Sequence, residues 1–387
     1  APRPARSSMD LSYTAEEEAF RARVRKWLGE NVPAPEETRH LEGARAWQRK
    51  LHVAGLLGAA WPKEYGGAGL SAMEQAILNE EMVRARAPQP INQMAIWWVG
   101  PAIMRYGTEE QKKRFIPKIL TCEEIWATGY SEPSSGSDMA AAKTSAKREG
   151  DFYVVNGQKV WTTLAHISDW YFVLVRTSTE GPKWAGLTVL LMDLKSPGIS
   201  IKPIKQIDGG AEFNEVFMTD VRVPVTNRLG EEGQGWEVVS SALVNERSGI
   251  AGGIRADQVL EWVVSTARRQ GKTDDPNVRQ KIADLAIKGS IMRCAGMRSL
   301  TDALRERLNP HLSAAMKLMG TTLVQEFSET GIELLGPYGA LMNDEHAPDG
   351  GRWARQYLGD RSMTIAGGTS EVQRNIVAQR VLGLPRR

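Results

Sequence analysis

The stretch Phe152-Tyr-Val-Val-Asn-Gly-Gln-Lys-Val-Trp-Thr-Thr163 lies in the part of this 387-residue chain, beginning near Ile125, where helical patterns give way to extended ones. Its two halves, residues 152–155 and 159–162, flank Asn156-Gly157, a pair typical of tight β-hairpins. Further short strands are expected downstream, over residues 171–176, 187–192, 199–204, 215–219 and 221–223. About six strands without helical patterns between them predict a compact antiparallel sandwich or barrel.

Helical patterns precede and follow this β region. The first helix is expected to begin at Thr14, because the acidic side chains that follow it suit a helix N-terminus. The other predicted helices cover residues 45–57, 72–85, 91–106, 109–119, 236–256, 257–269, 278–308, 314–335 and 370–381. In the last of these, Ser370 and Gln373 have the spacing of a capping box.

The predicted fold class is therefore α+β, in three domains. An N-terminal α-helical domain is expected over residues 9–124 and a central antiparallel β domain over 125–232. A C-terminal helical bundle domain is expected over 233–387. A chain of this length exceeds the size at which single hydrophobic cores stop growing, which agrees with this division.

Composition limits the classes of function. Hydrophobic residues make up 42% and charged residues 25%, values of a soluble globular protein. The net charge of +3 predicts no strong attraction to nucleic acid, and no apolar run is long enough to cross a membrane. The only cysteines, Cys122 and Cys294, are too few for a disulfide framework and favour a reducing cytoplasm.

Several common catalytic patterns are absent from the sequence. It contains neither G-x-G-x-x-G nor G-x-x-x-x-G-K-[ST], which disfavours Rossmann and P-loop nucleotide sites. The five histidines are scattered and lack zinc-ligand spacing, so no metal site is expected. No G-x-S-x-G is present either, which disfavours an α/β-hydrolase.

Glu246 is a carboxylate on an apolar helical stripe. The stripe recurs at steps of three and four residues and consists of Trp236, Val239, Leu243, Glu246 and Ile250. A carboxylate there is either paired, with Arg247 or a neighbouring helix, or has its pKa raised by desolvation, as general bases do. Position alone favours the structural pair.

Two polar segments border the β region. Residues 130–138 offer hydroxyls and a glycine suited to backbone donors, but they also fit an ordinary serine-rich turn. Trp161-Thr162-Thr163 places an aromatic plane and two hydroxyls at the end of a strand. This arrangement suits a flat heterocycle, and it equally suits a capped core strand.

Motifs in these segments resemble those of the acyl-CoA dehydrogenase family. The chain has Y-S-E-P-x-x-G-S-D at 130–138, N-G-x-K-x-W-x-T at 156–163 and G-T-S-E-V-Q-R at 368–374. Residues 61–69 and 106–112 are similar to the family's N-terminal domain, so the resemblance covers roughly Met9 to Arg386. It implies a C-terminal four-helix bundle, with FAD between it and the β domain.

The resemblance also implies the reaction and the partners. A base removes the α-proton of an acyl-CoA thioester while flavin N5 takes the β-hydride, and an electron-transferring flavoprotein reoxidises the cofactor. Members are usually homotetramers or homodimers. A reaction of this kind requires a desolvated base and hydrogen bonds that stabilise enolate charge on the thioester oxygen.

The resemblance assigns expected roles to individual residues. Those expected to border or contact the flavin are Thr128, Gly129, Tyr130, Ser131, Trp161 and Thr163. Ser137 matches the position that binds the CoA arm, whereas Thr369 and Glu371 match positions near FAD. The segment at Gly367 and Gly368 is expected to lie against the substrate thioester.

The position of the base departs from the commonest pattern of the family. Many members carry it as the Glu of a Y-E-G-T motif, and the matching residues here are Ala366-Gly367-Gly368-Thr369. A smaller branch, including the isovaleryl-type enzymes, carries it in an E-R pair on the first helix of the C-terminal domain. Glu246-Arg247 matches that pair, so Glu246 is the predicted base and Arg247 is expected to aid the CoA arm.

Two further departures concern FAD. The R-x-x-F-G segment reads Arg268-Arg269-Gln270-Gly271-Lys272, and the Q-x-x-G-G segment that holds the ADP half reads Glu333-Leu334-Leu335-Gly336-Pro337. These changes resemble branches that act on bulky substrates such as steroid side-chain CoA esters, some of them heteromeric. Gly367 and Trp97-Trp98 prompt the hypothesis of a branched, cyclic or bulky acyl group.

Three alternatives stand beside the main interpretation. The first is a subunit of a heteromeric dehydrogenase that needs a partner chain for complete FAD sites. The second is a flavin-bearing DNA-binding member, which a basic C-terminal region would favour and the small net charge disfavours. The third, nitroalkane oxidation, requires an Asp where this chain has Gly367.

Overall fold

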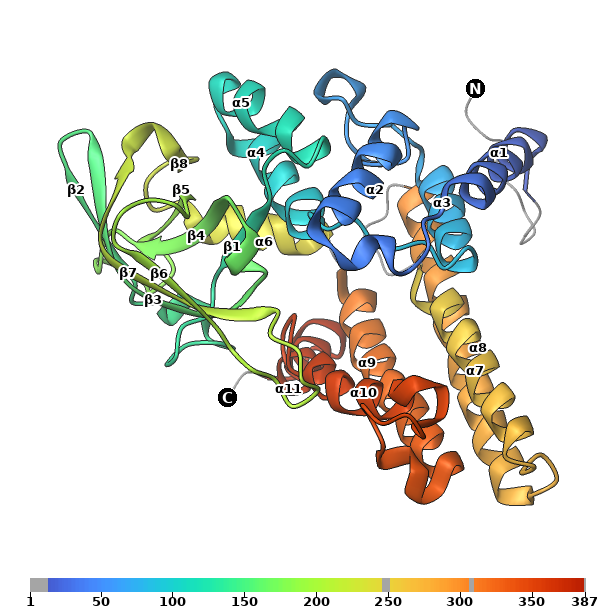
Figure 1. Cartoon of the computed structure of the whole chain (residues 1–387). Coiled ribbons are helices and arrows are strands. Elements are labelled where there is room, and N and C mark those ends of the chain that lie inside the picture. The colour runs from blue at the N-terminus through green and yellow to red at the C-terminus, as the bar shows by residue number, and fades with distance from the viewer. Residues whose placement is uncertain (1–12, 246–250, 306–309, 386–387) are drawn as a thin grey trace.

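The computed structural model confirms the α+β fold class and describes residues 13–245, 251–305 and 310–385 (Figure 1). Helices form the N-terminal region, strands the middle and helices the C-terminal region. The predicted start at Thr14 is confirmed, because its hydroxyl accepts a hydrogen bond from Glu17 N while the Glu17 carboxylate accepts one from Thr14 N. Among the described residues, no helix is long and apolar enough to cross a membrane.

The N-terminal helices pack around a core of aromatic and aliphatic side chains. They are α1 (Ala15–Asn31), α2 (Leu41–Val53), α3 (Ala72–Arg84), a π-helical turn (Ala95–Val99), α4 (Gly100–Tyr106) and α5 (Glu109–Leu120). Trp61 supports the π-helical turn by donating a 3.2 Å hydrogen bond from Nε1 to Ile96 O. Gly100 makes room for its ring, since a Cβ there would lie 2.3 Å from the indole.

The strands of the middle region form one eight-stranded sheet. They are β1 (Trp126–Gly129), β2 (Ser145–Glu149), β3 (Phe152–Thr163), β4 (Trp170–Arg176), β5 (Leu187–Asp193), β6 (Ile199–Pro203), β7 (Phe213–Pro224) and β8 (Arg228–Leu229). The order is β6-β7-β3-β2-β4-β5-β8, and β1 pairs with β4. Most pairings are antiparallel as predicted, whereas β1 and β2 meet β4 in parallel.

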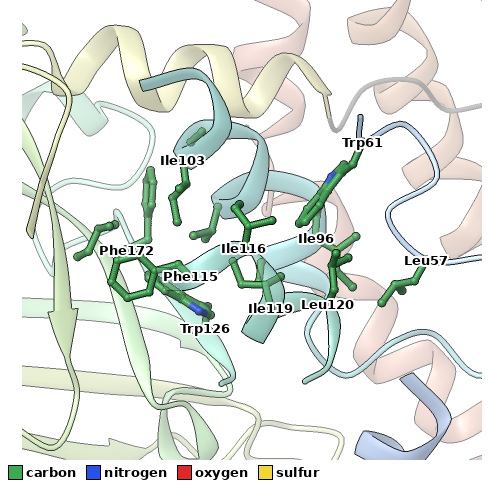
Figure 2. Close-up of a cluster of buried hydrophobic side chains, with 14 of the residues drawn as sticks. Leu57, Trp61, Ile96, Ile103, Phe115, Ile116, Ile119, Leu120, Trp126 and Phe172 are labelled. Atoms are coloured by element: carbon green, nitrogen blue, oxygen red, sulfur yellow. The ribbon is translucent and has the colours of Figure 1, made fainter. Parts of the chain in front are cut away.

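Strand β4 is buried on both faces. Tyr171 and Val173 point into the core of the β domain, while Phe172 points into the core of the N-terminal helices. Figure 2 shows Phe172 beside Phe115 of α5 and Trp126 of β1, and the rings of Phe115 and Trp126 meet edge to face at 5.1 Å. The sheet and the N-terminal helices therefore share one hydrophobic core.

The C-terminal region begins with a helix that packs on the sheet. Its helices are α6 (Gly235–Asn245), α7 (Ala251–Arg269), α8 (Pro276–Leu304), α9 (Pro310–Leu335), α10 (Arg352–Gly359) and α11 (Ser370–Ile376). α6 contacts β4, β5, α4 and the π-helical turn, whereas α7, α8 and α9 pack against one another (Figure 1). Gly331 of α9 admits the ring of Trp353, which lies 2.2 Å from where a Cβ would stand.

Several local predictions were wrong. The predicted boundary between helices at residues 256 and 257 is absent, because α7 runs across it from Ala251 to Arg269. Asn156-Gly157 does not form a hairpin turn, because β3 runs unbroken through both residues and pairs with β7. Gly157, with a φ of +152°, lies at a β-bulge, and the Asn156 side chain exchanges two 2.9 Å hydrogen bonds with Asp220 of β7. The β2–β3 hairpin instead turns at Gly150, whose φ is +62°.

The capping residue of α11 also differs from the prediction. Thr369, not Ser370, is the N-cap, and its hydroxyl accepts a 3.2 Å hydrogen bond from Val372 N. Gln373 does not complete a capping box, because its side-chain amide donates to Gly367 O at 3.1 Å. The glycine turn before the helix thus determines where the cap lies.

Candidate active site

The segment Thr128–Ser131 runs off the end of β1 and is fixed by its neighbours. Gly129 is required there, because a Cβ at this position would lie 2.3 Å from the Tyr171 hydroxyl. The Ser131 carbonyl accepts a 2.9 Å hydrogen bond from Val160 N on β3. The predicted flavin-bordering residues on β1 therefore lie beside the end of β3, as a shared site requires.

Strand β3 ends in a conformation that turns Trp161 outward. Trp161 has a φ of +61°, lies at a register shift between Lys159 and Thr162, and leaves 58% of its surface exposed. Its ring meets Phe213 edge to face at 6.2 Å. Positive φ is strained for a non-glycine residue and such strain gathers at functional sites, so the conformation of Trp161 agrees with the predicted flavin contact.

Tyr171 connects the two segments. Its hydroxyl lies 2.9 Å from Thr162 Oγ1 and approaches Gly129 from the other side. Burial raises the pKa of Tyr171 well above its ordinary value, so the phenol keeps its proton. Thr162 therefore points inward, whereas Thr163, the next residue, is only half-buried and is the predicted flavin contact.

A buried ion pair lies behind these residues, and the sequence reasoning missed it. Lys159 Nζ lies 2.8 Å from Glu132 Oε1 and donates a 3.1 Å hydrogen bond to Tyr130 O. Burial lowers the pKa of Lys159 to about 8, against the opposing effect of Glu132. Burial would raise the pKa of Glu132, but Lys159 and the surrounding donors hold it below its usual range.

Ser137 lies in the exposed part of the loop that follows Glu132. Arg176 of β4 fixes the end of this loop, since its guanidinium donates 2.7 Å hydrogen bonds to Ala140 O and Ala142 O. Ser137 is thus accessible to a ligand on a loop whose base is held in place.

The Gly367-Gly368 turn lies on the C-terminal helices. Gly367 and Gly368 have φ values of +64° and +87°, and Lys317 of α9 donates a 2.7 Å hydrogen bond to Gly368 O. Thr369 caps α11, and Glu371 lies exposed in its first turn. Hydrogen bonds from its own backbone N–H and from Thr369 lower the pKa of Glu371, so it is ionised at neutral pH.

The predicted ADP-binding residues lie elsewhere on the chain. Glu333 is sixteen residues beyond Lys317 on α9, which corresponds to about 24 Å along the helix axis. Glu333 forms an ion pair with Lys281, and Lys272 donates a 2.8 Å hydrogen bond to Leu334 O. The segments around 268–272 and 333–337 are therefore brought to each other, at the end of the helices away from the Gly368 turn.

Glu246 and Arg247 lie outside the described residues. The described part of α6 ends at Asn245, and α7 begins at Ala251. α6 packs against the sheet and the π-helical turn that carries Trp97 and Trp98. Trp97 is 42% exposed, and the buried Nε1 of Trp98 has no hydrogen-bond partner among the described residues. π-Helical turns are frequent at functional sites.

The residues around Trp161 fit a flavin. They offer an exposed aromatic face at Trp161, a half-buried hydroxyl at Thr163 and the backbone of the segment that leaves β1. A flat heterocycle can stack on the indole while backbone and hydroxyl groups bond its edge. The donor set thus suits the ring system of FAD.

Comparison with known proteins agrees with this geometry. The family models for the N-terminal, middle and C-terminal domains of acyl-CoA dehydrogenases match residues 14–123, 127–221 and 233–382. Acyl-CoA dehydrogenase IpdE1 of Mycobacterium tuberculosis is 40% identical over 382 residues, which cover 95% of this chain and 98% of that protein.

Two solved structures are similar over nearly the whole chain. The steroid acyl-CoA dehydrogenase Tcur3481–Tcur3483 is 34% identical with a TM-score of 0.88, and the match covers 98% of this chain and 100% of that one. The ChsE4–ChsE5 complex from Mycobacterium tuberculosis is 34% identical with a TM-score of 0.85 and the same coverage. The chain therefore belongs to the acyl-CoA dehydrogenase family, whose members are FAD-dependent oxidoreductases that act on CH–CH groups.

Proposed function

We propose that this chain catalyses the α,β-dehydrogenation of an acyl-CoA thioester, with Glu246 as the base that removes the α-proton. The supporting observation is the Gly367-Gly368 turn, which carries no proton acceptor where many family members carry their Glu. Because the α-proton is weakly acidic, a member without a base at either position could not remove it. Glu246, directly after α6, is the remaining position.

The other site residues hold the reactants. Trp161, Thr163 and the segment Thr128–Ser131 bind and orient the flavin ring, while Thr369 and Glu371 lie toward the remainder of FAD. Ser137 and Arg247 bind the CoA arm, and the Gly367-Gly368 turn faces the thioester. When bound, FAD supplies the hydride acceptor at flavin N5.

Anaerobic mixing of the purified protein with acyl-CoA tests the base assignment. Glu246→Gln is expected to retain FAD but to lose flavin bleaching by substrate. Glu237→Gln is the matched control, because Glu237 lies on α6, nine residues before Glu246 in the chain, and accepts a 3.2 Å hydrogen bond from the Tyr106 hydroxyl. Wild-type bleaching rates in Glu246→Gln would refute the role.

We further propose that the acyl group is bulky. Gly367 carries no side chain in the segment proposed to face the thioester, and Trp97 offers an exposed aromatic wall next to α6. The Tcur3481–Tcur3483 structure, a steroid acyl-CoA dehydrogenase, supports a polycyclic substrate. A panel of straight-chain, branched and steroid side-chain CoA esters tests this, and a preference for straight chains would contradict it.

We also propose that the chain assembles with a second chain through α8. An exposed apolar stripe runs along this helix and comprises Ala283, Ile287, Ile291, Cys294 and Met297. Exposed apolar stripes of this length mark interaction surfaces. The proposed partner is another copy of this chain, in a homodimer or homotetramer. Ile291→Glu is expected to lower the mass measured by light scattering, whereas an unchanged mass would exclude this stripe from the interface.

A heteromeric assembly is the second candidate. Glu333 lies about 24 Å along α9 from Lys317, whose side chain bonds the Gly368 turn, and this separation suits contact of the segments 268–272 and 333–337 with the FAD of a neighbouring subunit. Glu333 forms an ion pair with Lys281, and as a carboxylate it lacks the side-chain amide that the family's glutamine would offer to the ADP half. Two of the similar structures, Tcur3481–Tcur3483 and the ChsE4–ChsE5 complex, are named for two different chains. If the chain purified alone holds one FAD per subunit and turns over, this candidate is excluded.

We propose an electron-transferring flavoprotein as the electron acceptor. The family reaction leaves reduced flavin, which must be reoxidised before the next turnover. Substrate-dependent reduction of a purified electron-transferring flavoprotein by the holoenzyme tests this. Reoxidation by oxygen alone at the turnover rate would contradict it.

A reducing cytoplasm is the proposed location. Cys122 and Cys294 are both free thiols in the described structure. Burial raises the pKa of Cys122 to about 11, which makes it a poor nucleophile. Cell fractionation checks the location, and recovery from an oxidising compartment would contradict it.

A further inference from the structure

Lys159 and Glu132 form an ion pair with almost no solvent contact. The Lys159 side chain is 0% exposed and that of Glu132 is 5% exposed. Besides Lys159, the Glu132 carboxylate accepts hydrogen bonds from Lys143 N at 2.6 Å and Thr144 N at 2.8 Å. Lys159 also donates a hydrogen bond to Tyr130 O. The pair therefore joins three segments of the chain, at residues 130–132, 143–144 and 159.

Stability does not account for such a pair. Desolvating two charges costs about as much as their attraction returns, and apolar replacements of similar volume are often as stable. A strand in a β domain would ordinarily carry an apolar residue at the inward position of Lys159. The role of the pair is therefore sought in the backbone positions that it fixes.

The three segments are those that flank the proposed flavin site. Tyr130 belongs to the segment that leaves β1, and Lys159 precedes Trp161 on β3 by two residues, just before the register shift that turns the indole outward. Next to the pair, Val160 N donates a 2.9 Å hydrogen bond to Ser131 O, which is a second link between the same two segments. Lys143 and Thr144 end the loop that carries Ser137.

We propose that Lys159 and Glu132 are positioning residues that set the spacing between the segment Thr128–Ser131 and the end of β3 at Trp161 and Thr163. This inference rests on the proposed flavin site. The pair touches neither cofactor nor substrate, and it acts through the backbone of Tyr130 and through the strand that carries Trp161.

The test compares apoprotein and FAD-loaded protein for Lys159→Met/Glu132→Gln. The double variant leaves no unpaired charge, so the apoprotein is expected to fold. Its melting temperature is expected to be lower because Tyr130 O loses its hydrogen bond from Lys159. Its dissociation constant for FAD, measured by flavin fluorescence quenching, is expected to rise about tenfold or more. The visible circular dichroism of bound flavin is expected to change, because the ring geometry changes.

Val223→Ala is the matched control. Val223 is 2% exposed in the core of the same β domain, on β7, so its truncation lowers stability without touching the three segments. It is expected to lower the melting temperature while leaving FAD affinity and flavin dichroism unchanged. A general stability effect would move both variants alike.

Each outcome separates the two proposals. Wild-type FAD affinity and dichroism in the double variant would overturn the positioning role while leaving the flavin site intact. Failure of the wild-type protein to bind FAD would overturn the proposed function and this role with it. If the double variant does not fold, Lys159→Gln/Glu132→Gln, which also leaves no unpaired charge and keeps hydrogen-bonding groups, is measured against the same control, and unchanged affinity and dichroism would again overturn the role.

Discussion

The side-chain amine of Lys317 on α9 donates a 2.7 Å hydrogen bond to the backbone carbonyl of Gly368. The Gln373 amide donates to Gly367 O at 3.1 Å from the other side. Two side chains from different helices therefore fix a turn whose glycines both have positive φ, so the shape of this turn is a tertiary property.

Lys317→Met is expected to loosen the Gly367-Gly368 turn. It removes a charged donor whose hydrogen bond contributes roughly 1.5–3 kcal/mol, equivalent to about tenfold or more in binding. We expect kcat/KM for acyl-CoA to fall by about that factor while FAD content stays at the wild-type level. Lys288→Met is the control, because Lys288 pairs with Asp284 and Glu326 elsewhere on the bundle. Equal kinetics in the two variants would show that the bond does not shape the site.

Gly129→Ala is expected to destabilise the β domain by about 1–3 kcal/mol, the usual cost of overpacking. The added Cβ would lie 2.3 Å from the Tyr171 hydroxyl, which is fully buried and cannot withdraw. Denaturant unfolding of the apoprotein measures the loss. Gly136→Ala, where nothing lies within 4 Å of the new Cβ, should be nearly neutral. Similar losses in both variants would contradict the steric argument.

Trp161→Ala is expected to separate binding from stability. The indole is 58% exposed, so its loss should change the free energy of unfolding of the apoprotein by only about 0.5 kcal/mol. FAD affinity should fall by about three- to tenfold, because stacked aromatic pairs contribute about 0.5–1.5 kcal/mol. Trp184→Ala, at a residue 50% exposed, serves as the control. An unchanged dissociation constant for FAD would remove Trp161 from the flavin site.

The stability of the apoprotein is expected to carry a pH dependence from Lys159. Burial lowers its folded pKa to about 8 from 10.5, with Glu132 opposing this shift and Arg176 adding to it. Between these pH values the unfolded chain binds more protons at this group, so its contribution to stability rises with pH. The rise is at most about 1.4 kcal/mol per pH unit for one proton.

Denaturant unfolding at several pH values between about 8 and 10.5, the folded and unfolded pKa values of Lys159, measures how the free energy of unfolding changes with pH. The wild-type protein is compared with Lys159→Met/Glu132→Gln. The double variant has no group to titrate at these positions, so the wild-type curve should rise relative to it. Parallel curves would show that the pKa of Lys159 is not lowered in the folded protein.

Local sequence signals predicted most of the helices and their order, but not α10 or the start of α7. The helix start at Thr14 and the change to β-rich sequence near Ile125 depend on residues close together in the chain, and both are confirmed. Asn156-Gly157 misled the prediction because the same pair suits a tight turn and a bulge. Pairing with β7, some 60 residues later, selects the bulge.

The sequence by itself determined the α–β–α organisation, the family motifs and the candidate residues, including Glu246, which stays a prediction. Only the tertiary structure decided that Gly129 must admit the Tyr171 hydroxyl, that Trp161 turns outward and that Lys159 meets Glu132. Helix caps and amphipathic patterns depend on neighbours along the chain. Steric fit and the pairing of buried charges depend instead on side chains that only the folded chain brings together.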